Sequence, residues 1–357
     1  MSAPAARSAG STVVVTGAAG QLGRRVLPLL AADPSVGRVI ALDTDPVVAS
    51  GKIEPRTVDL LVADLDALLH GADVLVHLAS SSRTEVDADD AHKVNVDGTA
   101  LLLAAASRTG VNQVVGLSSA MVYGAWANNP IPLTEDAPVR PNPEFAFATQ
   151  KARVEQLLAD WAAQSPERVA AVLRPAIALS EGEASYVARL LAAAAGVRAG
   201  DNEPPQQFVA LDDVASAVDI ARRNRLDGPY NVAPDGWVPA ETVQALTGAP
   251  PRVRLPARVA ARLASWSWEL QLGPIPPGLL PYTMYPWVIA NDRLKAAGWQ
   301  PRSTNEEAYV AGTEGSWWSM MSPKRKQELA LGASGVAMLI SGGAVAYLVR
   351  RTSRSRR

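Results

Sequence analysis

The sequence contains no cysteine, and only three of its 357 residues are histidine. The lack of cysteine excludes a disulfide-stapled fold, a thiol nucleophile, a cysteine zinc site and an iron–sulfur cluster. Three histidines make a multi-histidine metal site unexpected, so no metal is predicted. The formal net charge of −1 does not provide the basic surface of a general nucleic-acid binder, and no nucleic-acid partner is expected.

Apolar residues are abundant: 48% of the chain is hydrophobic. A chain of this length has room for two to three globular units and for a large core. Residues 1–11 are small and polar and lack the apolar stretch of a signal peptide, so a disordered N-terminus is expected there.

Short β-branched runs alternate with helical patterns in the first half of the chain. The strands are predicted at 13–16, 39–42, 56–60, 74–78, 114–117 and 169–173, and the helices at 21–32, 87–108 and 145–163. Strands that are apolar along their whole length belong to parallel sheets covered on both faces. The predicted fold is therefore α/β, a Rossmann-type doubly wound parallel sheet over residues 12–180. A smaller, mixed C-terminal substrate lobe is expected over 181–310.

A glycine turn follows the first predicted strand, with the spacing G-x-x-G-x-x-G at Gly17, Gly20 and Gly23. The first glycine permits a tight turn, the second lets the backbone approach a pyrophosphate, and the third allows close packing of helix on strand. The phosphates would then face the N-terminus of the helix. Asp43 ends the second strand twenty residues later, where a carboxylate binds ribose hydroxyls and repels a 2′-phosphate. The unit predicts NAD in preference to NADP.

Further motifs recur in a fixed order along the chain. They are TGAAGQLG at 16–23, LD at 42–43, DL at 59–60, HLAS at 77–80, NVDGT at 95–99, LSSAMVYG at 117–124, Lys151, RPA at 174–176 and FVALDDVA at 208–215. With these motifs, residues 12–300 resemble the extended short-chain dehydrogenase/reductase family, which contains NAD-dependent epimerases and dehydratases of nucleotide sugars.

The resemblance implies a role for particular residues. Those to which it assigns NAD(H) binding are Gly17, Gly20, Gln21, Leu22, Gly23, Asp43, Asp59, Leu60, Ala79, Ser80, Lys151, Pro175 and Ala176. It further implies that Asn95 braces the sheet and that Asp212 and Asp213 tie the substrate lobe to it. His77 is interpreted as a satisfied core histidine rather than a catalytic one. Arg189, Arg198, Arg252 and Arg254 are weaker candidates for contacting a nucleotide diphosphate.

The catalytic group departs from the family's pattern. Active members use a Ser, a Tyr that exchanges the substrate hydroxyl proton, and a Lys four residues after that Tyr. Ser119 and Lys151 match the Ser and the Lys, but the Tyr position holds Phe147. Phenylalanine cannot exchange a proton. Ala120 and Met121 stand where the family's dehydratases place an Asp and a Glu, which argues against a standard sugar 4,6-dehydratase.

A C-terminal membrane anchor is also expected. Residues 329–349 are 21 residues without a charge, long enough as a helix to span roughly 30 Å. A linker over 311–328 precedes this segment, and a basic tail with five arginines follows over 350–357. We expect a transmembrane helix that anchors the protein as a single-pass membrane protein. Because NAD pools are cytosolic, the globular domain is expected in the cytoplasm.

Two functional hypotheses follow. The first is a membrane-anchored NAD-binding protein with weak or lost Tyr-dependent catalysis, acting as a sensor, scaffold or subunit. The alternative is an active NAD-dependent epimerase or dehydrogenase that acts on a nucleotide sugar or another hydroxyl substrate through a modified proton relay. Phe147 favours the first, and whether the chain is an enzyme stays open at this point. A homo-oligomer is compatible with either.

Overall fold

The computed structural model describes residues 10–81, 88–181, 183–194, 197–200, 202–247, 253–272 and 275–313. The expected transmembrane segment at 329–349, the basic tail and most of the expected disordered N-terminus lie outside these residues. Within the described ranges, no helix is long and apolar enough to cross a membrane. The chain divides into two units. The first consists of Met1–Val243 and Pro251–Glu314, and the second of Gln244–Pro250 and Gly315–Arg357. The site described below lies in the first unit.

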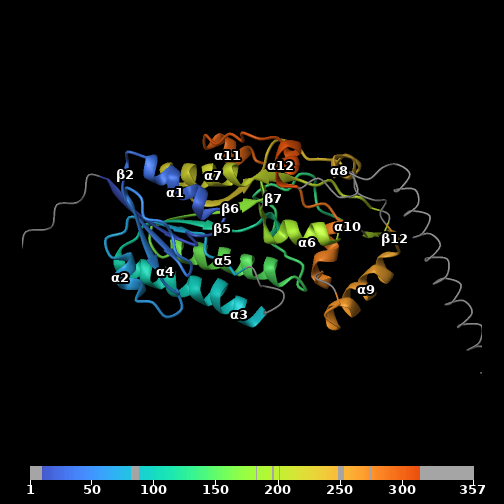
Figure 1. The fold of residues 1–357 in the computed structure, drawn as a ribbon, viewed down its shortest axis with the longest axis horizontal. Helices are drawn as coiled ribbons and strands as arrows, with labels where there is room; N and C mark the ends of the chain where they lie inside the picture. Colours follow the sequence, from blue (N-terminus) through green and yellow to red (C-terminus); the bar gives the residue numbers. More distant parts are fainter. Residues whose placement is uncertain are drawn as a thin grey trace, which may run out of the picture. The chain divides into compact units, whose positions relative to one another are not determined.

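A seven-stranded parallel sheet forms the centre of this unit, in the order β11-β6-β5-β4-β1-β2-β3 (Figure 1). Its strands are β1 (Ser11–Thr16), β2 (Val36–Asp43), β3 (Ile53–Thr57), β4 (Val74–His77), β5 (Gln113–Leu117), β6 (Val169–Pro175) and β11 (Gly228–Val232). The reversal of strand order at β1 and β4 is the place where ligands bind in open α/β sheets. The predicted Rossmann-type sheet is confirmed.

Helices cover both faces of the sheet. The helices are α1 (Gly23–Ala32), α2 (Leu65–Leu69), α3 (Ala88–His92), α4 (Gly98–Thr109), α5 (Ala146–Ala163), α6 (Tyr186–Ala194), α7 (Leu211–Arg223), α8 (Ala240–Thr247), α9 (Ala257–Glu269), α10 (Leu280–Met284), α11 (Asp292–Ala296) and α12 (Asn305–Gly312). Figure 1 shows α1 and α7 on one face and α2, α4 and α5 on the other. Side chains alternate along a strand, so successive residues of β1 belong to the hydrophobic cores on opposite faces of the sheet. Val13 and Val15 pack with α1 and α7, and Val14 packs with α2, α4 and α5.

The remaining strands belong to two small sheets and serve the substrate lobe. They are β7 (Ile177–Ser180), β8 (Glu183–Ala184) and β10 (Phe208–Ala210) in one sheet, and β9 (Val197–Ala199) and β12 (Val253–Leu255) in the other. The predicted domain boundary at residue 180 needs correction, because β11 at 228–232 pairs in parallel with β6 and completes the main sheet. The chain therefore leaves the sheet for the lobe and returns to it.

Two predicted elements are shifted or divided. The third strand, predicted at 56–60, is observed at 53–57, because β3 pairs with β2 only until β2 ends at Asp43. Asp59 and Leu60 consequently lie in the loop after the strand. The helix predicted over 87–108 is interrupted by a π-helical turn, η1 (Lys93–Asp97). Such turns within helices are frequent at functional sites.

That π-helical turn carries Asn95, which bridges two segments. The Asn95 Oδ1 accepts a hydrogen bond from the Ser81 amide at 2.7 Å, and its Nδ2 donates to Gln150 Oε1 at 2.8 Å. Ser81 follows β4, and Gln150 lies on α5. The buried Asn95 thus connects the loop after β4 to the helix that carries Lys151.

A buried carboxylate fastens the end of the described chain to α7. Asp213 is 1% exposed, and its two oxygens accept hydrogen bonds from the backbone amides of Arg302 and Ser303 at 2.9 and 3.1 Å. The neighbouring Asp212 is instead exposed and pairs with Arg25 of α1 at 3.1 Å. Of these two adjacent acids, Asp213 is therefore expected to contribute more to the stability of the fold.

We expect Asp213→Ala to lower the free energy of unfolding by about 2 kcal/mol or more, because two buried amides lose their acceptor. Asp212→Ala is the matched control and should cost less than about 1 kcal/mol, since exposed ion pairs contribute little. Urea unfolding of both variants followed by circular dichroism provides the comparison. Equal losses would contradict the assignment of Asp213 as the tie.

Candidate nucleotide-binding and active site

A cavity of about 770 Å³ opens at the carboxyl ends of the central strands. Its walls come from the glycine turn, the loops after β2, β3, β4 and β5, the start of α5 and α6, and the end of β6. All of the sequence-predicted site residues line it: Gly17, Gly20, Gln21, Leu22, Gly23, Asp43, Asp59, Leu60, Ala79, Ser80, Ser119, Phe147, Lys151, Pro175 and Ala176. These predicted residues, of which Gly17 and Ala176 are 159 positions apart in the sequence, therefore share one cavity.

The glycine turn admits no side chain at two of its three glycines. Gly17 has φ +70°, and a Cβ there would lie 2.6 Å from the Ala79 backbone nitrogen. A Cβ on Gly23 would lie 2.3 Å from the Gly17 carbonyl oxygen. Gly20 is exposed on the cavity side. The turn therefore presents bare backbone at the start of α1, where the helix dipole favours an anion.

Asp43 connects this turn to the end of β2. Its Oδ2 accepts a hydrogen bond from the Ala19 amide at 2.8 Å, and its Oδ1 accepts one from the Asp45 amide at 3.0 Å. The carboxylate is half-buried and lines the cavity. A fixed negative charge at this position suits ribose hydroxyls and opposes a 2′-phosphate. The turn and Asp43 together fit a dinucleotide that carries no 2′-phosphate.

Ser119 and Lys151 approach the cavity from β5 and α5. Ser119 begins a 3-10 turn, η2 (Ala120–Tyr123), and its Oγ accepts a hydrogen bond from the Met121 amide at 3.3 Å. The Lys151 Nζ donates to the Leu117 carbonyl at 3.1 Å. Burial lowers the pKa of Lys151 to about 8, although the charge of Glu155 acts in the opposite direction. Near neutral pH the Lys151 ammonium is therefore mostly charged.

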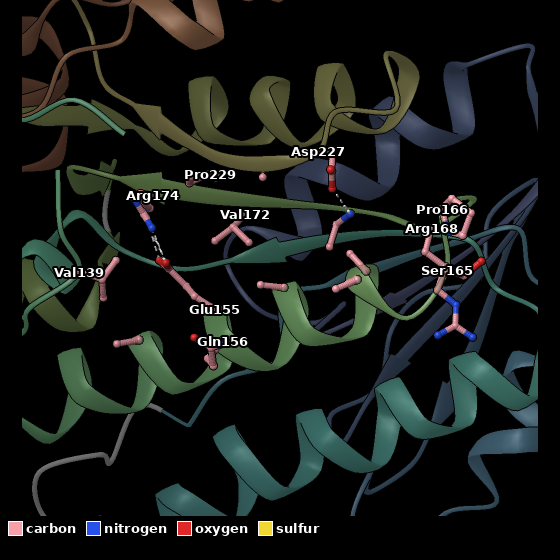
Figure 2. A pocket seen from close by; sticks show the side chains of 16 residues that line it. Val139, Glu155, Gln156, Ser165, Pro166, Arg168, Val172, Arg174, Asp227 and Pro229 are labelled. Carbon is pink, nitrogen blue, oxygen red and sulfur yellow. Dashed lines mark hydrogen bonds and ion pairs between the residues drawn. The ribbon is translucent and has the colours of Figure 1, made fainter. Parts of the chain in front are cut away.

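Glu155 belongs to a buried polar network behind the cavity. It accepts hydrogen bonds from Ser118 Oγ and from Arg174, whose Nη2 lies 2.6 Å from Glu155 Oε2. Figure 2 shows these two charged side chains pointing at each other beside a second cavity of about 730 Å³. That cavity contains none of the predicted site residues. The pair holds Ser118, next to Ser119, and Arg174, next to Pro175, in fixed positions.

Tyr123 is part of the same network and is not suited to proton exchange. Its hydroxyl donates to Asn231 Oδ1 at 2.8 Å and accepts from Arg174 at 2.7 Å. Burial raises the pKa of Tyr123 to about 12, against the opposing effect of Arg174. The side chain is 0% exposed and does not line the nucleotide cavity. Tyr123 therefore does not replace the missing phenol at position 147.

His77 has two partners in the core. Its Nδ1 lies 2.7 Å from Thr16 Oγ1 and its Nε2 lies 2.8 Å from Thr99 Oγ1. Burial, with the charge of Lys151 as a smaller cause, lowers the pKa of His77 to about 3. The imidazole is consequently neutral at physiological pH and serves as a structural link from β1 through β4 to α4.

Among the cavity residues that the sequence did not predict, Tyr186 carries an ionisable hydroxyl group. It is the first residue of α6, it is half-buried, and it lines the cavity. Its ring packs against the ring of Phe147, with centroids 5.7 Å apart. The Lys151 Nζ lies 6.0 Å from the same Phe147 ring on the α5 side. A tyrosine of the substrate lobe thus lines the cavity beside Phe147, which stands where the family places its tyrosine.

The candidate arginines behave differently from one another. Arg189 is exposed and lines the cavity, on the same helix as Tyr186. Arg198 instead pairs with Glu203 at 2.9 Å, and Arg254 lies on β12; neither lines the cavity. Arg252 lies outside the described residues. Of the three candidates that the structure describes, Arg189 is the one that lines this cavity.

Comparison with known proteins shows which family and which relatives this chain is similar to. Residues 13–233 match the NAD dependent epimerase/dehydratase family. The chain is 28% identical over 264 residues to N-acetyl-alpha-D-glucosaminyl-diphospho-ditrans,octacis-undecaprenol 4-epimerase of Escherichia coli O157:H7, covering 68% of this chain and 75% of that protein. It is 34% identical over 167 residues to UDP-glucose 4-epimerase of Azospirillum brasilense, covering 43% and 45%.

A solved structure shares the fold. UDP-glucose 4-epimerase of Thermus thermophilus, crystallised as a complex with NAD, superposes with a TM-score of 0.61 at 22% sequence identity. The superposition covers 84% of this chain and 97% of that one. The likeness extends beyond the Rossmann-type sheet into the substrate lobe.

The geometry predicts how Lys151 responds to its neighbour. Because the Glu155 charge raises the pKa of Lys151, Glu155→Gln should move that pKa below about 8. Side-chain NMR titration of selectively labelled lysine measures the change, and Lys151→Met identifies the signal. An unchanged or raised pKa in Glu155→Gln would show that the carboxylate does not act on Lys151.

Proposed function

Because the chain belongs to the NAD-dependent epimerase/dehydratase family, we propose that it binds NAD and interconverts epimers of a sugar linked to a diphosphate. The observation that carries this proposal is the joining of Asp43, Ser119, Lys151 and Tyr186 in one cavity. The cavity supplies a dinucleotide cradle, a cation and two hydroxyl groups. These are the parts that hydride transfer at a secondary alcohol needs from a protein.

The cradle residues hold the cofactor in this proposal. Gly20 at the start of α1 would hold the pyrophosphate, and the Asp43 carboxylate would bind the adenosine ribose. Pro175 and Ala176 would border the nicotinamide, and the Lys151 ammonium would hold the second ribose. When bound, NAD supplies a hydride acceptor and donor at the substrate carbon.

Proton exchange falls to Tyr186. With its phenol ionised, the Tyr186 oxygen would take the proton of the substrate hydroxyl and give it back at the end of the cycle, while bound NAD would supply the hydride acceptor and donor. Ser119 donates a hydrogen bond to the substrate oxygen and orients it. Phe147 packs on the Tyr186 ring at 5.7 Å and keeps the phenol in the cavity. Dehydration is not proposed, since Ala120 and Met121 carry no ionisable group and are fully buried.

Two observations support a substrate sugar that is linked to a diphosphate: the substrates of the relatives and the position of Arg189. Both named relatives act on sugars joined to a diphosphate, one on a lipid carrier and the other on uridine. In this chain Arg189 stands exposed on α6, three residues after Tyr186 and in the same cavity. A guanidinium pairs with phosphate oxygens in a bidentate manner. Arg189 therefore binds the diphosphate while Tyr186 faces the sugar.

The second candidate function is a protein that binds NAD but has weak or lost catalysis, as a sensor, scaffold or subunit. The observation that favours it is Phe147, which stands one turn before Lys151 on α5 and cannot exchange a proton. The cofactor cradle is the same in both candidates. They differ only in whether Tyr186 works as the acid–base group.

Attachment to a membrane belongs to the proposal as well. The uncharged segment 329–349, with Lys324–Lys326 before it and five arginines after it, is its support. In this proposal the segment anchors the protein, and the NAD-binding unit lies in the cytoplasm. A lipid-linked substrate such as that of the Escherichia coli relative would then be presented at the same membrane.

Cofactor choice is predicted to depend on the charge of Asp43. Asp43→Asn keeps an oxygen that accepts from the Ala19 amide but removes the negative charge. NAD binding should weaken about tenfold, and the preference over NADP should shrink, because hydrogen bonds to a charged group are the stronger ones. Calorimetric titration with both dinucleotides measures this. Asp45→Asn is the control, and a response equal to that of Asp43→Asn would refute the assignment.

The acid–base assignment separates the two candidate functions. With UDP-glucose or UDP-N-acetylglucosamine and NAD, Tyr186→Phe should lower kcat roughly 10²- to 10⁴-fold, while calorimetry shows unchanged NAD binding. Tyr230→Phe, on β11 and away from the cavity, should retain activity. If wild-type protein is inactive and Phe147→Tyr creates turnover, the NAD-binding protein without catalysis is the correct function.

A further inference from the structure

An exposed apolar stripe runs along α9 (Ala257–Glu269) and its C-terminal cap. Val259, Leu263, Trp266 and Leu270 follow the spacing i, i+4, i+7 and i+11, which places them on one face of a helix. They are 43%, 47%, 59% and 51% exposed. In a water-soluble helix this face would ordinarily be packed, and here the residue of α9 that is buried is Ala260.

The same region is basic. Between residue 251 and the end of α9 the sequence holds four arginines and one acidic residue, Glu269, although the whole chain has a net charge of −1. Arg258 and Arg262 lie exposed on α9 beside the stripe, and Arg254 is exposed on β12 directly before it. In Figure 1, α9 lies below α10 and β12, at the end of this unit away from β2. Nothing in the catalytic proposal uses these side chains.

We propose that α9 lies on the surface of a phospholipid bilayer with anionic headgroups, its apolar stripe inserted at the headgroup boundary. A helix with an apolar face, a tryptophan and arginines beside that face has the composition of interfacial membrane helices. Tryptophan favours the level of the headgroups, and each arginine near an anionic surface adds to the attraction. The partner is the lipid surface itself, independent of the substrate that the active site takes.

The charges argue against a second copy of this chain as the occupant. A symmetric contact through the stripe would collect Arg258 and Arg262 of both copies against the single carboxylate, Glu269, that each copy has on α9, and the surplus of like charges in a desolvated contact repels. The uncharged segment 329–349 fits the apolar stripe but leaves the arginines without a counter-charge. An anionic bilayer satisfies both features together.

The chain length permits both membrane contacts at once. Between Thr313, the last described residue, and residue 329 lie 15 residues, which span at most roughly 50–55 Å when extended. An anchor at 329–349 and a surface contact through α9 can therefore engage the same bilayer. The surface contact is then a second, intramolecular attachment, favoured by a high effective concentration.

The experiment exploits the lack of cysteine, because one introduced cysteine is the only thiol in the protein. Leu263→Cys is labelled with an environment-sensitive bimane in the full-length chain, which is reconstituted into vesicles of 70% phosphatidylcholine and 30% phosphatidylglycerol. Leu101→Cys on α4 is the matched control, since Leu101 and Leu263 are both leucines with 47% exposure. A second label at Trp266→Cys covers the case in which Leu263→Cys perturbs the helix.

The labels at 263 and 266 should emit at shorter wavelength in vesicles and be quenched by lipids carrying a nitroxide near the headgroup, and the label at 101 should do neither. Vesicles of phosphatidylcholine alone should give a smaller shift. Vesicle-bound protein whose labels at 263 and 266 remain unquenched overturns the proposal. Two results without lipid also overturn it. An emission shift of the labels that grows with protein concentration identifies a second copy as the occupant. An emission shift that is present in the full-length chain but absent from protein ending at Gln327 identifies the chain's own tail as the occupant.

Discussion

The close contact of backbone with backbone at the glycine turn is the constraint on which the site depends. A side chain on Gly17 would strike the backbone at Ala79, and one on Gly23 would strike the Gly17 carbonyl. These contacts bring α1 directly onto the junction of β1 and β4, where the strand order reverses. The cavity forms at that junction, with Asp43 fixing the turn from the neighbouring strand. Every other part of the site is positioned relative to this junction.

Local signals were sufficient to predict much of this arrangement. Apolar runs and helical spacing identified most of the sheet, and the fixed order of motifs placed fifteen scattered residues in what is one cavity. The predictions differ from the structure where strand pairing determines the bounds of an element or of the sheet. The third strand ends where its neighbour β2 ends, and β11 returns to the sheet from beyond the predicted boundary. Tyr186 escaped prediction because its approach to Phe147 depends on how the substrate lobe folds back, and no sequence spacing records that.

Burial gives the polar residues around the cavity distinct chemical roles. Lys151 remains ionisable near neutral pH because Glu155 partly offsets the cost of its burial. Glu155 is in turn held by Arg174, and breaking such a buried pair costs far more than the pair contributes. Tyr123 and His77 are locked in uncharged forms by their burial. Tyr186 is a phenol at the cavity wall, and its ring packs against that of Phe147.

The proposed epimerisation requires the Tyr186 hydroxyl to lie close to the bound nicotinamide and to the sugar. A crystal structure of the full chain with NAD and UDP-glucose measures this directly. The account predicts the pyrophosphate over the turn at Gly20, the adenosine ribose on Asp43, and the Tyr186 oxygen within hydrogen-bond distance of the sugar hydroxyl next to the nicotinamide. A complex in which NAD occupies this cavity while the Tyr186 hydroxyl points away from the sugar would contradict it.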